Sequence, residues 1–125
     1  MRATVQRIDR GSVVVLKPIG RMTIDSSKGE ELLKQDVLRA LAEGVRFFVI
    51  DGSEVTYADS AALGEMVRAY TRVLGVGGRL AFAVPLQHQL RNRFHLTKLD
   101  QELSIYTSVD EAIAAFEPRV GEATR

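Results

Sequence analysis

Apolar and polar residues alternate along this chain in two rhythms, one typical of strands and one typical of helices. Short apolar segments rich in β-branched residues predict strands. Among them, VRFFVI (residues 45–50) is almost entirely apolar, which predicts a strand covered on both faces, as in a parallel sheet packed between helices. The predicted strands are Thr4–Ile8, Ser12–Ile19, 45–50, Arg79–Val84 and Leu103–Tyr106. Asp9, Arg10 and Gly11 predict a tight turn, so the first two strands form a hairpin.

Four longer segments between these strands carry apolar residues at helical spacing. Ser27 with Glu30, and Ser108 with Glu111, are capping-box pairs that predict where the first and last helices begin. The second helix follows Asp59 and Ser60 and ends at the glycines of GVGG (residues 75–78), and Pro85 opens the third. The apolar faces consist of Leu33, Val37, Leu38 and Leu41; Leu63, Met66, Val67, Tyr70, Val73 and Leu74; Leu86, Leu90 and Phe94; and Val109, Ile113 and Phe116.

This alternation of strands and helices predicts an α/β fold with a mostly parallel sheet and right-handed crossovers. The length of 125 residues suits one compact domain, which we assign to residues 1–117. Residues 118–125, which open with Pro118 and end in small and charged residues, are expected to form a flexible C-terminal tail.

Composition narrows the class of partner. The chain has 17 basic and 16 acidic residues, a balance that gives no reason to expect nucleic acid or a membrane surface as partner. It has no cysteine, which excludes disulfides and thiolate metal sites and suggests a reducing compartment. No apolar run approaches the ~20 residues of a membrane span, so we expect a cytoplasmic protein.

No pattern in the sequence indicates catalysis, and we expect no enzyme, no cofactor and no metal. His88 and His95 are seven residues apart, a poor spacing for metal ligands, which suggests surface or packing roles. Asp51 ends an apolar strand, where a receiver domain carries its phosphorylated aspartate. The acidic pair and the lysine that a receiver also needs are missing, so we expect Asp51 to bind backbone amides of the next loop.

The joint at Asp59 and Ser60 admits two interpretations. Either residue can cap the helix, because serine and aspartate oxygens accept hydrogen bonds from the unpaired N–H groups of a first turn. Alternatively, Ser60 is a modification site: a phosphate there would meet the positive end of the helix dipole, while a protein docked over it would meet added negative charge beside Asp59.

Residues 49–85, VIDGSEVTYADSAALGEMVRAYTRVLGVGGRLAFAVP, resemble the central part of STAS domains, the fold of bacterial anti-sigma factor antagonists. The family hallmark is an apolar strand, a short polar loop and Asp-Ser-(Ser/Thr)-Gly-Leu-Gly opening a helix. Here it reads Asp59-Ser60-Ala61-Ala62-Leu63-Gly64. The resemblance covers residues 4–117 and implies a single STAS-like domain: a mixed, mostly parallel sheet of about five strands and about four helices, most of them on one side.

The resemblance also implies a function. In the family, the serine after that aspartate, Ser60 here, is phosphorylated by a serine kinase that is also the anti-sigma factor, and a phosphatase reverses the modification. The unphosphorylated antagonist binds the kinase and frees the sigma factor. The loop Gly20-Arg21-Met22-Thr23 departs from the family's Gly-Glu-Leu-Asp, and Ala61 and Ala62 replace a hydroxyl residue and a glycine.

The leading hypothesis is therefore a protein-binding module switched by phosphorylation of Ser60. The alternative is a STAS scaffold that binds a transport or stress-signalling assembly constitutively, with Ser60 as a helix cap only. The expected docking face combines residues 20–27, residues 55–58 and the exposed side of the second helix, to which we assigned Glu65, Arg68, Ala69 and Arg72. The individual partner-binding candidates are Asp59, Ala58, Tyr57, Thr23, Asp25, Gly64 and Arg68.

Overall fold

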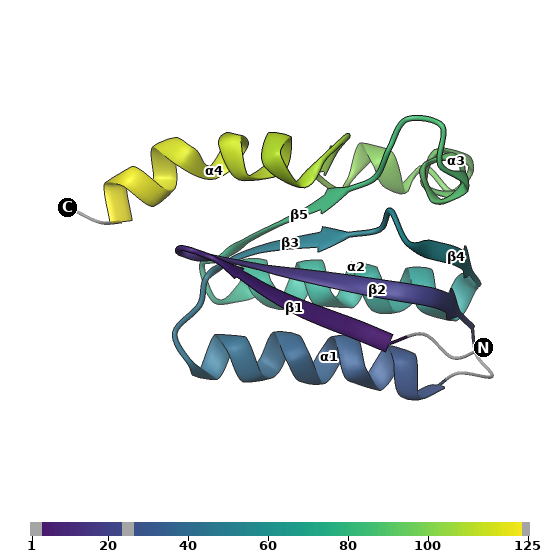
Figure 1. Cartoon of the computed structure of the whole chain (residues 1–125), viewed down its shortest axis with the longest axis horizontal. Coiled ribbons are helices and arrows are strands. Elements are labelled where there is room, and N and C mark those ends of the chain that lie inside the picture. The colour runs from purple at the N-terminus through teal and green to yellow at the C-terminus, as the bar shows by residue number, and fades with distance from the viewer. Residues whose placement is uncertain (1–3, 24–26, 124–125) are drawn as a thin grey trace.

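The computed structural model of the chain describes residues 4–23 and 27–123. Six strands and four α-helices alternate along it, with one short 3-10 helix before the last strand (Figure 1). In chain order the elements are β1 (Thr4–Arg10), β2 (Val13–Met22), α1 (Ser27–Ala42), β3 (Phe47–Asp51), β4 (Val55–Ala58), α2 (Ser60–Gly75), β5 (Arg79–Ala83), α3 (Gln89–Leu96), η2 (Leu99–Gln101), β6 (Ile105–Tyr106) and α4 (Val109–Ala123).

The strands form one mixed sheet in the order β1-β2-β3-β5-β6, with β4 paired to the far end of β2. Only the β1–β2 hairpin is antiparallel, and the other described pairings are parallel. The predicted α/β class, the mostly parallel sheet and the four helices are thus confirmed. The hairpin turn is shorter than predicted: Arg10 pairs with Val13, so Asp9 and Arg10 belong to β1 and the turn is Gly11–Ser12, with Gly11 at a φ of 64°.

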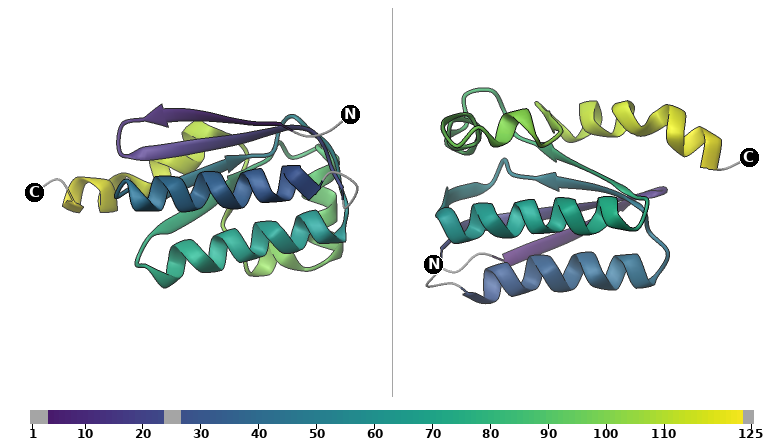
Figure 2. Two further views of the ribbon diagram at one scale, coloured as in Figure 1. Left: turned by 90° about the horizontal axis from the view of Figure 1, so that it is seen from below. Right: turned by 180° about the vertical axis from the view of Figure 1, so that it is seen from behind.

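Helices cover both faces of the sheet. α1 and α2 lie side by side on one face, and α4 covers the other (Figures 1 and 2). Alternate residues of the central strands divide accordingly, because successive side chains of a strand point to opposite faces. The face toward α1 and α2 carries the large residues Leu16, Phe48, Ile50, Leu80 and Phe82. The face toward α4 carries Val13, Val15, Val49, Ala81 and Ala83.

β4 was not among the predicted strands. Its four residues, VTYA, include a polar threonine and are too few to show a strand period. It exists because the end of β2 reaches beyond β3 and pairs with it, after a register shift between Gly20 and Arg21. This pairing brings the end of β2 beside the start of α2, where the Asp59 N–H donates to the Met22 carbonyl.

Two helix boundaries also differ from prediction. α3 begins at Gln89 rather than Pro85, because His88 caps it: its Nδ1 accepts a hydrogen bond from the Leu90 N–H at 3.0 Å. α4 continues through Pro118 to Ala123, so the expected loose tail from Pro118 is wrong as to secondary structure. A proline inside a helix removes one N–H donor and crowds the carbonyl of the residue four positions earlier, so Pro118 makes this part of α4 less stable without ending it. One half of the second predicted capping box forms, since the Glu111 N–H donates to Ser108 Oγ at 3.1 Å. The Glu111 carboxylate accepts instead from the Thr107 N–H, at 2.9 Å. The first predicted capping box, Ser27 with Glu30, lies among residues whose side chains are outside the described part of the structure.

Candidate functional site

The N-terminus of α2 is capped by Asp59. Its backbone is extended, with φ −85° and ψ −178°, and its Oδ1 accepts a hydrogen bond from the Ala62 N–H at 2.9 Å. The Asp59 N–H donates to the Met22 carbonyl at 3.0 Å, which anchors the cap to the end of β2. Of the two caps considered from the sequence, Asp59 is the one that forms, and the assignment of Ser60 as a helix cap is wrong.

Ser60 is the first residue of α2, and it is exposed. Among the described residues its hydroxyl has no hydrogen-bond partner, whereas the Asp59 carboxylate accepts from the Ala62 N–H. The first residues of a helix direct unpaired N–H groups outward, and the helix dipole makes this end positive. A phosphoryl group on Ser60 would therefore be accessible to a kinase and favourably placed on its own helix.

Replacing the Asp59 side chain by that of alanine measures how much the cap contributes to the free energy of unfolding. Asp59→Ala is expected to lower the free energy of unfolding by about 1 kcal/mol, because it removes the acceptor for the Ala62 N–H. Ser60→Ala is expected to change it by less than about 0.5 kcal/mol. Urea unfolding of both variants provides the measurement, with Asp59→Ser, which keeps an acceptor, as control. Equal losses for Asp59→Ala and Ser60→Ala would contradict this assignment of the cap.

Ser60, Gly64 and Arg68 follow one another at intervals of four residues and form a stripe along α2. A Cβ at Gly64 would lie 3.4 Å from Arg68 Nη1, so the guanidinium leans over Gly64 toward the start of the helix. Arg68 retains 58% of its side-chain exposure, and its Nη2 donates to Glu65 Oε2 at 3.2 Å. The stripe thus places a guanidinium, paired with the Glu65 carboxylate, one to two turns beyond Ser60.

Two residues assigned to the exposed side of this helix are buried. Ala69 is fully buried and Glu65 is 7% exposed. Ala69 completes a buried series with Ala62, Met66 and Val73, and a small side chain within such a series is easily mistaken for a surface position. Glu65 borders the same series, and its second oxygen, Oε1, has no partner among the described residues.

The remaining predicted contact residues have different surroundings. Tyr57 in β4 is half-buried, whereas the Ala58 side chain is only 1% exposed and offers a partner no surface. Thr23 is half-buried directly after β2. Asp25 lies outside the described residues. Arg72, on α2, is half-buried.

Arg93 was missed from the sequence. The ring of Tyr57 lies between two guanidinium groups: Arg21 Cζ is 5.0 Å and Arg93 Cζ is 5.3 Å from the ring centroid. Arg21 comes from β2 and Arg93 from α3, and α3 is also joined to β4 by a hydrogen bond from the Gln89 amide to the Thr56 carbonyl. Arg93 is 36 residues from Tyr57 in the chain, and no local pattern could have placed the two together. The result is a pair of guanidinium groups over one aromatic ring beside the start of α2.

Asp51 has the role predicted for it. Its Oδ1 accepts a hydrogen bond from the Ser53 N–H at 3.0 Å, which orders the turn between β3 and β4. The carboxylate therefore stabilises the loop that leads from β3 into β4.

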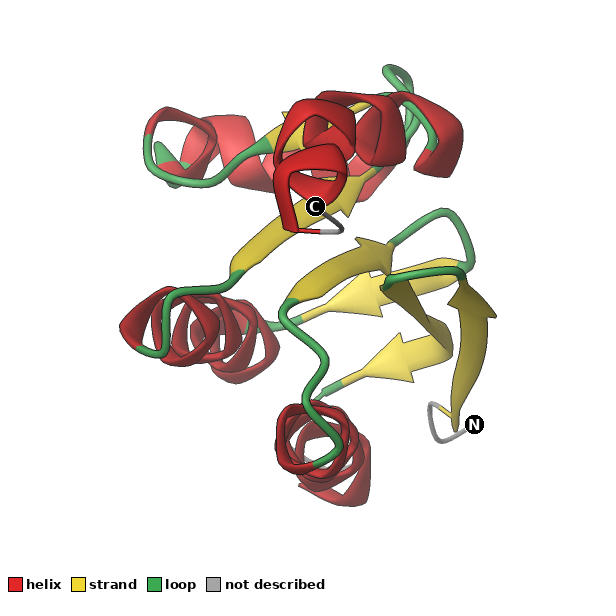
Figure 3. Ribbon diagram, turned by 90° about the vertical axis from the view of Figure 1, so that its left-hand side faces the viewer, coloured by secondary structure: helices red, strands yellow, loops and turns green. Residues whose placement is uncertain are grey.

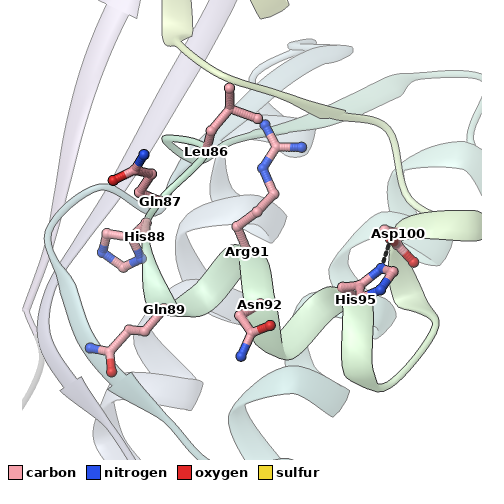
Figure 4. A pocket seen from close by; sticks show the side chains of 8 residues that line it. All are labelled: Leu86, Gln87, His88, Gln89, Arg91, Asn92, His95 and Asp100. Atoms are coloured by element: carbon pink, nitrogen blue, oxygen red, sulfur yellow. Dashed lines mark hydrogen bonds and ion pairs between the residues drawn. The ribbon is translucent and has the colours of Figure 1, made fainter.

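A polar hollow of about 530 Å³ lies beside α3 and contains both histidines (Figure 4). His88 is the cap of α3, and His95 Nδ1 lies 3.0 Å from Asp100 Oδ2. Among the side chains that the structure describes, no group of three or more histidines, aspartates and glutamates is arranged to hold a metal ion. Within residues 4–23 and 27–123, no helix has both the length and the apolar character needed to cross a bilayer.

Comparison with known proteins places this arrangement in a family. The family model described as STAS domain matches residues 4–112, and the chain belongs to this family. A protein from Thermotoga maritima, provisionally named an anti-sigma factor antagonist, has a similar structure: TM-score 0.77, 26% identity, covering 89% of this chain and 92% of that one.

Two further solved structures share the fold. An anti-sigma factor antagonist from Mycobacterium paratuberculosis superposes with a TM-score of 0.73 at 24% identity, over 90% of this chain and 92% of that chain. The Bacillus cell-fate determinant SpoIIAA, in its phosphorylated form, gives 0.66 at 18% identity, over 90% and 98%. Comparison with curated proteins gives no match.

Proposed function

We propose that this protein is an anti-sigma factor antagonist-like regulator, which binds a serine kinase that is also an anti-sigma factor and is released when Ser60 is phosphorylated. The observation that carries the proposal is that two adjacent residues at the start of α2 differ in role, since one caps the helix and the other does not. Asp59 supplies the cap, which leaves the exposed Ser60 hydroxyl available for modification.

The surroundings of Ser60 favour a modification that leaves the fold intact. A phosphate carries close to two negative charges at neutral pH and three acceptor oxygens. On Ser60 it would face the unpaired N–H groups of the first turn and the positive charge of Arg68 farther along the same stripe. The same charge, placed in a contact with another protein and beside Asp59, would repel acidic groups of that protein and cost it solvation.

We define the docking surface as Thr23, Tyr57, Asp59, Ser60, Gly64 and Arg68, with Arg21 and Arg93 at its edge. Members of the STAS family of this type are typically non-catalytic, and the similar Thermotoga protein is named as an antagonist of an anti-sigma factor. SpoIIAA, which shares the fold, has been solved both unphosphorylated and phosphorylated. These likenesses support a protein partner and a switch in this chain, and they leave the identity of the kinase, the phosphatase and the sigma factor to experiment.

The departures from the family hallmark suggest a distinct partner. Arg21 stands where the related loop carries an acid, and together with Arg93 it makes the surface around Tyr57 basic. Ala61 and Ala62 raise helix propensity at the start of α2. A kinase that fits this antagonist would therefore present an acidic contact where others present a basic one.

The experiment is phosphorylation by purified anti-sigma-type serine kinases encoded in the same genome, each incubated with this protein and ATP. Intact-mass spectrometry is expected to find one added phosphate with the cognate kinase and none on Ser60→Ala. Ser53→Ala is the matched control, because Ser53 is a half-buried serine seven residues away, and it is expected to accept the phosphate normally. A kinase that binds the protein but never modifies it would favour the constitutive scaffold instead.

A further inference from the structure

The outer edge of the sheet at β5 is only partly covered. β6 pairs with β5 at two positions, Phe82 with Ile105 and Ala83 with Tyr106, whereas β5 pairs with β3 along all five of its residues. The first half of β5 therefore has a described strand neighbour on one side only. Figure 1 shows α4 above this part of the sheet and α2 below it, and Figure 3 views the same region from the end where β5 begins.

The backbone at this edge has a defined direction. The Phe82 and Val84 N–H groups donate outward, to the Ser104 and Tyr106 carbonyls at 2.8 Å, while the Arg79 N–H donates inward, to Arg46. Because N–H groups alternate between the two sides of a parallel strand, Leu80 directs its N–H and carbonyl outward. β6 begins too late in the chain to pair with them.

A partly enclosed hollow of about 150 Å³ lies at this place. Its walls come from both faces of the sheet: Tyr70 and Leu74 from α2, Ala115 and Phe116 from α4, and Tyr106 from β6. Most of the lining residues are aromatic or aliphatic, but polar atoms contribute at least as much of the exposed wall as apolar atoms do. The volume of about 150 Å³ is enough for one benzene ring. The size and the walls therefore suit a single ring or a short branched chain.

One cation gives the hollow its polarity. Arg79, the first residue of β5, lines it, and its Nη1 donates to the Gly78 carbonyl at 3.0 Å. No carboxylate among the described residues forms an ion pair with Arg79. The remaining guanidinium N–H groups, the Ser104 side chain and the outward Leu80 N–H are donors suited to an anion.

We propose that this hollow is a binding site for a small amphipathic organic acid, whose ring or branched chain enters between α2 and α4 and whose carboxylate is held by Arg79. The site is separate from the docking surface. Tyr70 and Leu74 lie ten and fourteen residues after Ser60 on the same helix, or about 15 to 21 Å along its axis. The proposal does not depend on phosphorylation of Ser60.

Phenylacetate is the probe, with phenylacetamide as its uncharged counterpart, and chemical shifts of backbone amides in the whole protein report binding. Phenylacetate is expected to give saturable shifts around Leu80, Tyr106 and Ala115, with a Kd on the order of 1 mM for a ligand of this size. Ala115→Leu fills the hollow and is expected to weaken binding at least about tenfold. Ala114→Leu adds the same side chain at the exposed neighbouring position and is expected to leave binding unchanged.

A second variant tests whether binding depends on the contact between the ligand carboxylate and Arg79. Arg79→Gln is expected to weaken phenylacetate about tenfold, the loss of a charge-assisted contact, and to leave phenylacetamide binding unchanged. Arg39→Gln, an exposed arginine on α1, is the matched control. The proposal is overturned if phenylacetate gives no saturable shifts, if Ala115→Leu and Ala114→Leu behave alike, or if Arg79→Gln affects the acid and the amide equally.

Discussion

Gly78→Ala is expected to lower the free energy of unfolding by about 3 kcal/mol, at the upper end of the cost of overpacking. Gly78 is buried where α2 leads into β5, and a Cβ there would lie 2.5 Å from the Arg46 carbonyl oxygen and 2.8 Å from Val73 Cγ1. The nearer atom belongs to the backbone, which also accepts the first hydrogen bond of β5 from Arg79 at 2.8 Å. Relief of the clash therefore requires β3 and β5 to separate locally.

Gly75→Ala is the matched control, three residues earlier. Gly75 is the last residue of α2, is exposed, and has open space around the position of a Cβ. Alanine there is expected to be neutral or to stabilise by up to about 1 kcal/mol, because it restricts the unfolded chain. Guanidinium unfolding of both variants tests the contrast. If Gly78→Ala is as stable as Gly75→Ala, the close approach of β3 to the end of α2 is incorrect.

Ser60→Asp is expected to weaken binding to the cognate kinase about 100-fold, which corresponds to about 2.7 kcal/mol. A carboxylate in the docking surface next to Asp59 adds like charge to a desolvated contact, an effect of several kcal/mol in protein interfaces. The stability of the free protein is expected to change by less than about 0.5 kcal/mol, since an acid in the first turn interacts favourably with the helix dipole.

Ser60→Asn separates charge from shape in this experiment. Asparagine has nearly the volume of aspartate and no charge, and we expect it to retain most of the affinity in a calorimetric titration with the kinase. Equal weakening by aspartate and asparagine would mean that the kinase discriminates at residue 60 by the size of the side chain and not by its charge. Full affinity of Ser60→Asp, at unchanged stability, would remove the basis for an electrostatic switch at this residue.

The layered fold could be predicted from the sequence because its strands and helices differ in period and in composition. VRFFVI and RLAFAV have no polar face, and only a parallel strand covered on both sides accommodates that. β4 and the late start of α3 could not be predicted in this way. The first depends on pairing with the end of β2, and the second on a histidine acting as a cap, which is unusual.

The position of Ser60 at the start of α2 could be predicted from the sequence. That Asp59, and not Ser60, caps the helix could not. Asp59 and Ser60 are equally good caps by residue type, and only the hydrogen bond from Ala62 to Asp59 decides between them. The burial of Ala69 follows from its phase on α2 and could have been found by counting helical turns. The approach of Arg93 to Tyr57 depends on how α3 packs against β4, which no local pattern encodes.

The two faces of the sheet differ in the size of the apolar side chains that pack against their helices. Phenylalanine, isoleucine and leucine anchor α1 and α2, whereas α4 rests on valines and alanines, with Phe116 against Phe47 as its main aromatic contact, 5.5 Å between ring centroids. Less apolar area is available to resist removal of α4. We therefore expect local opening of the domain to begin on the side away from α2, where it would leave a partner bound at Ser60 undisturbed.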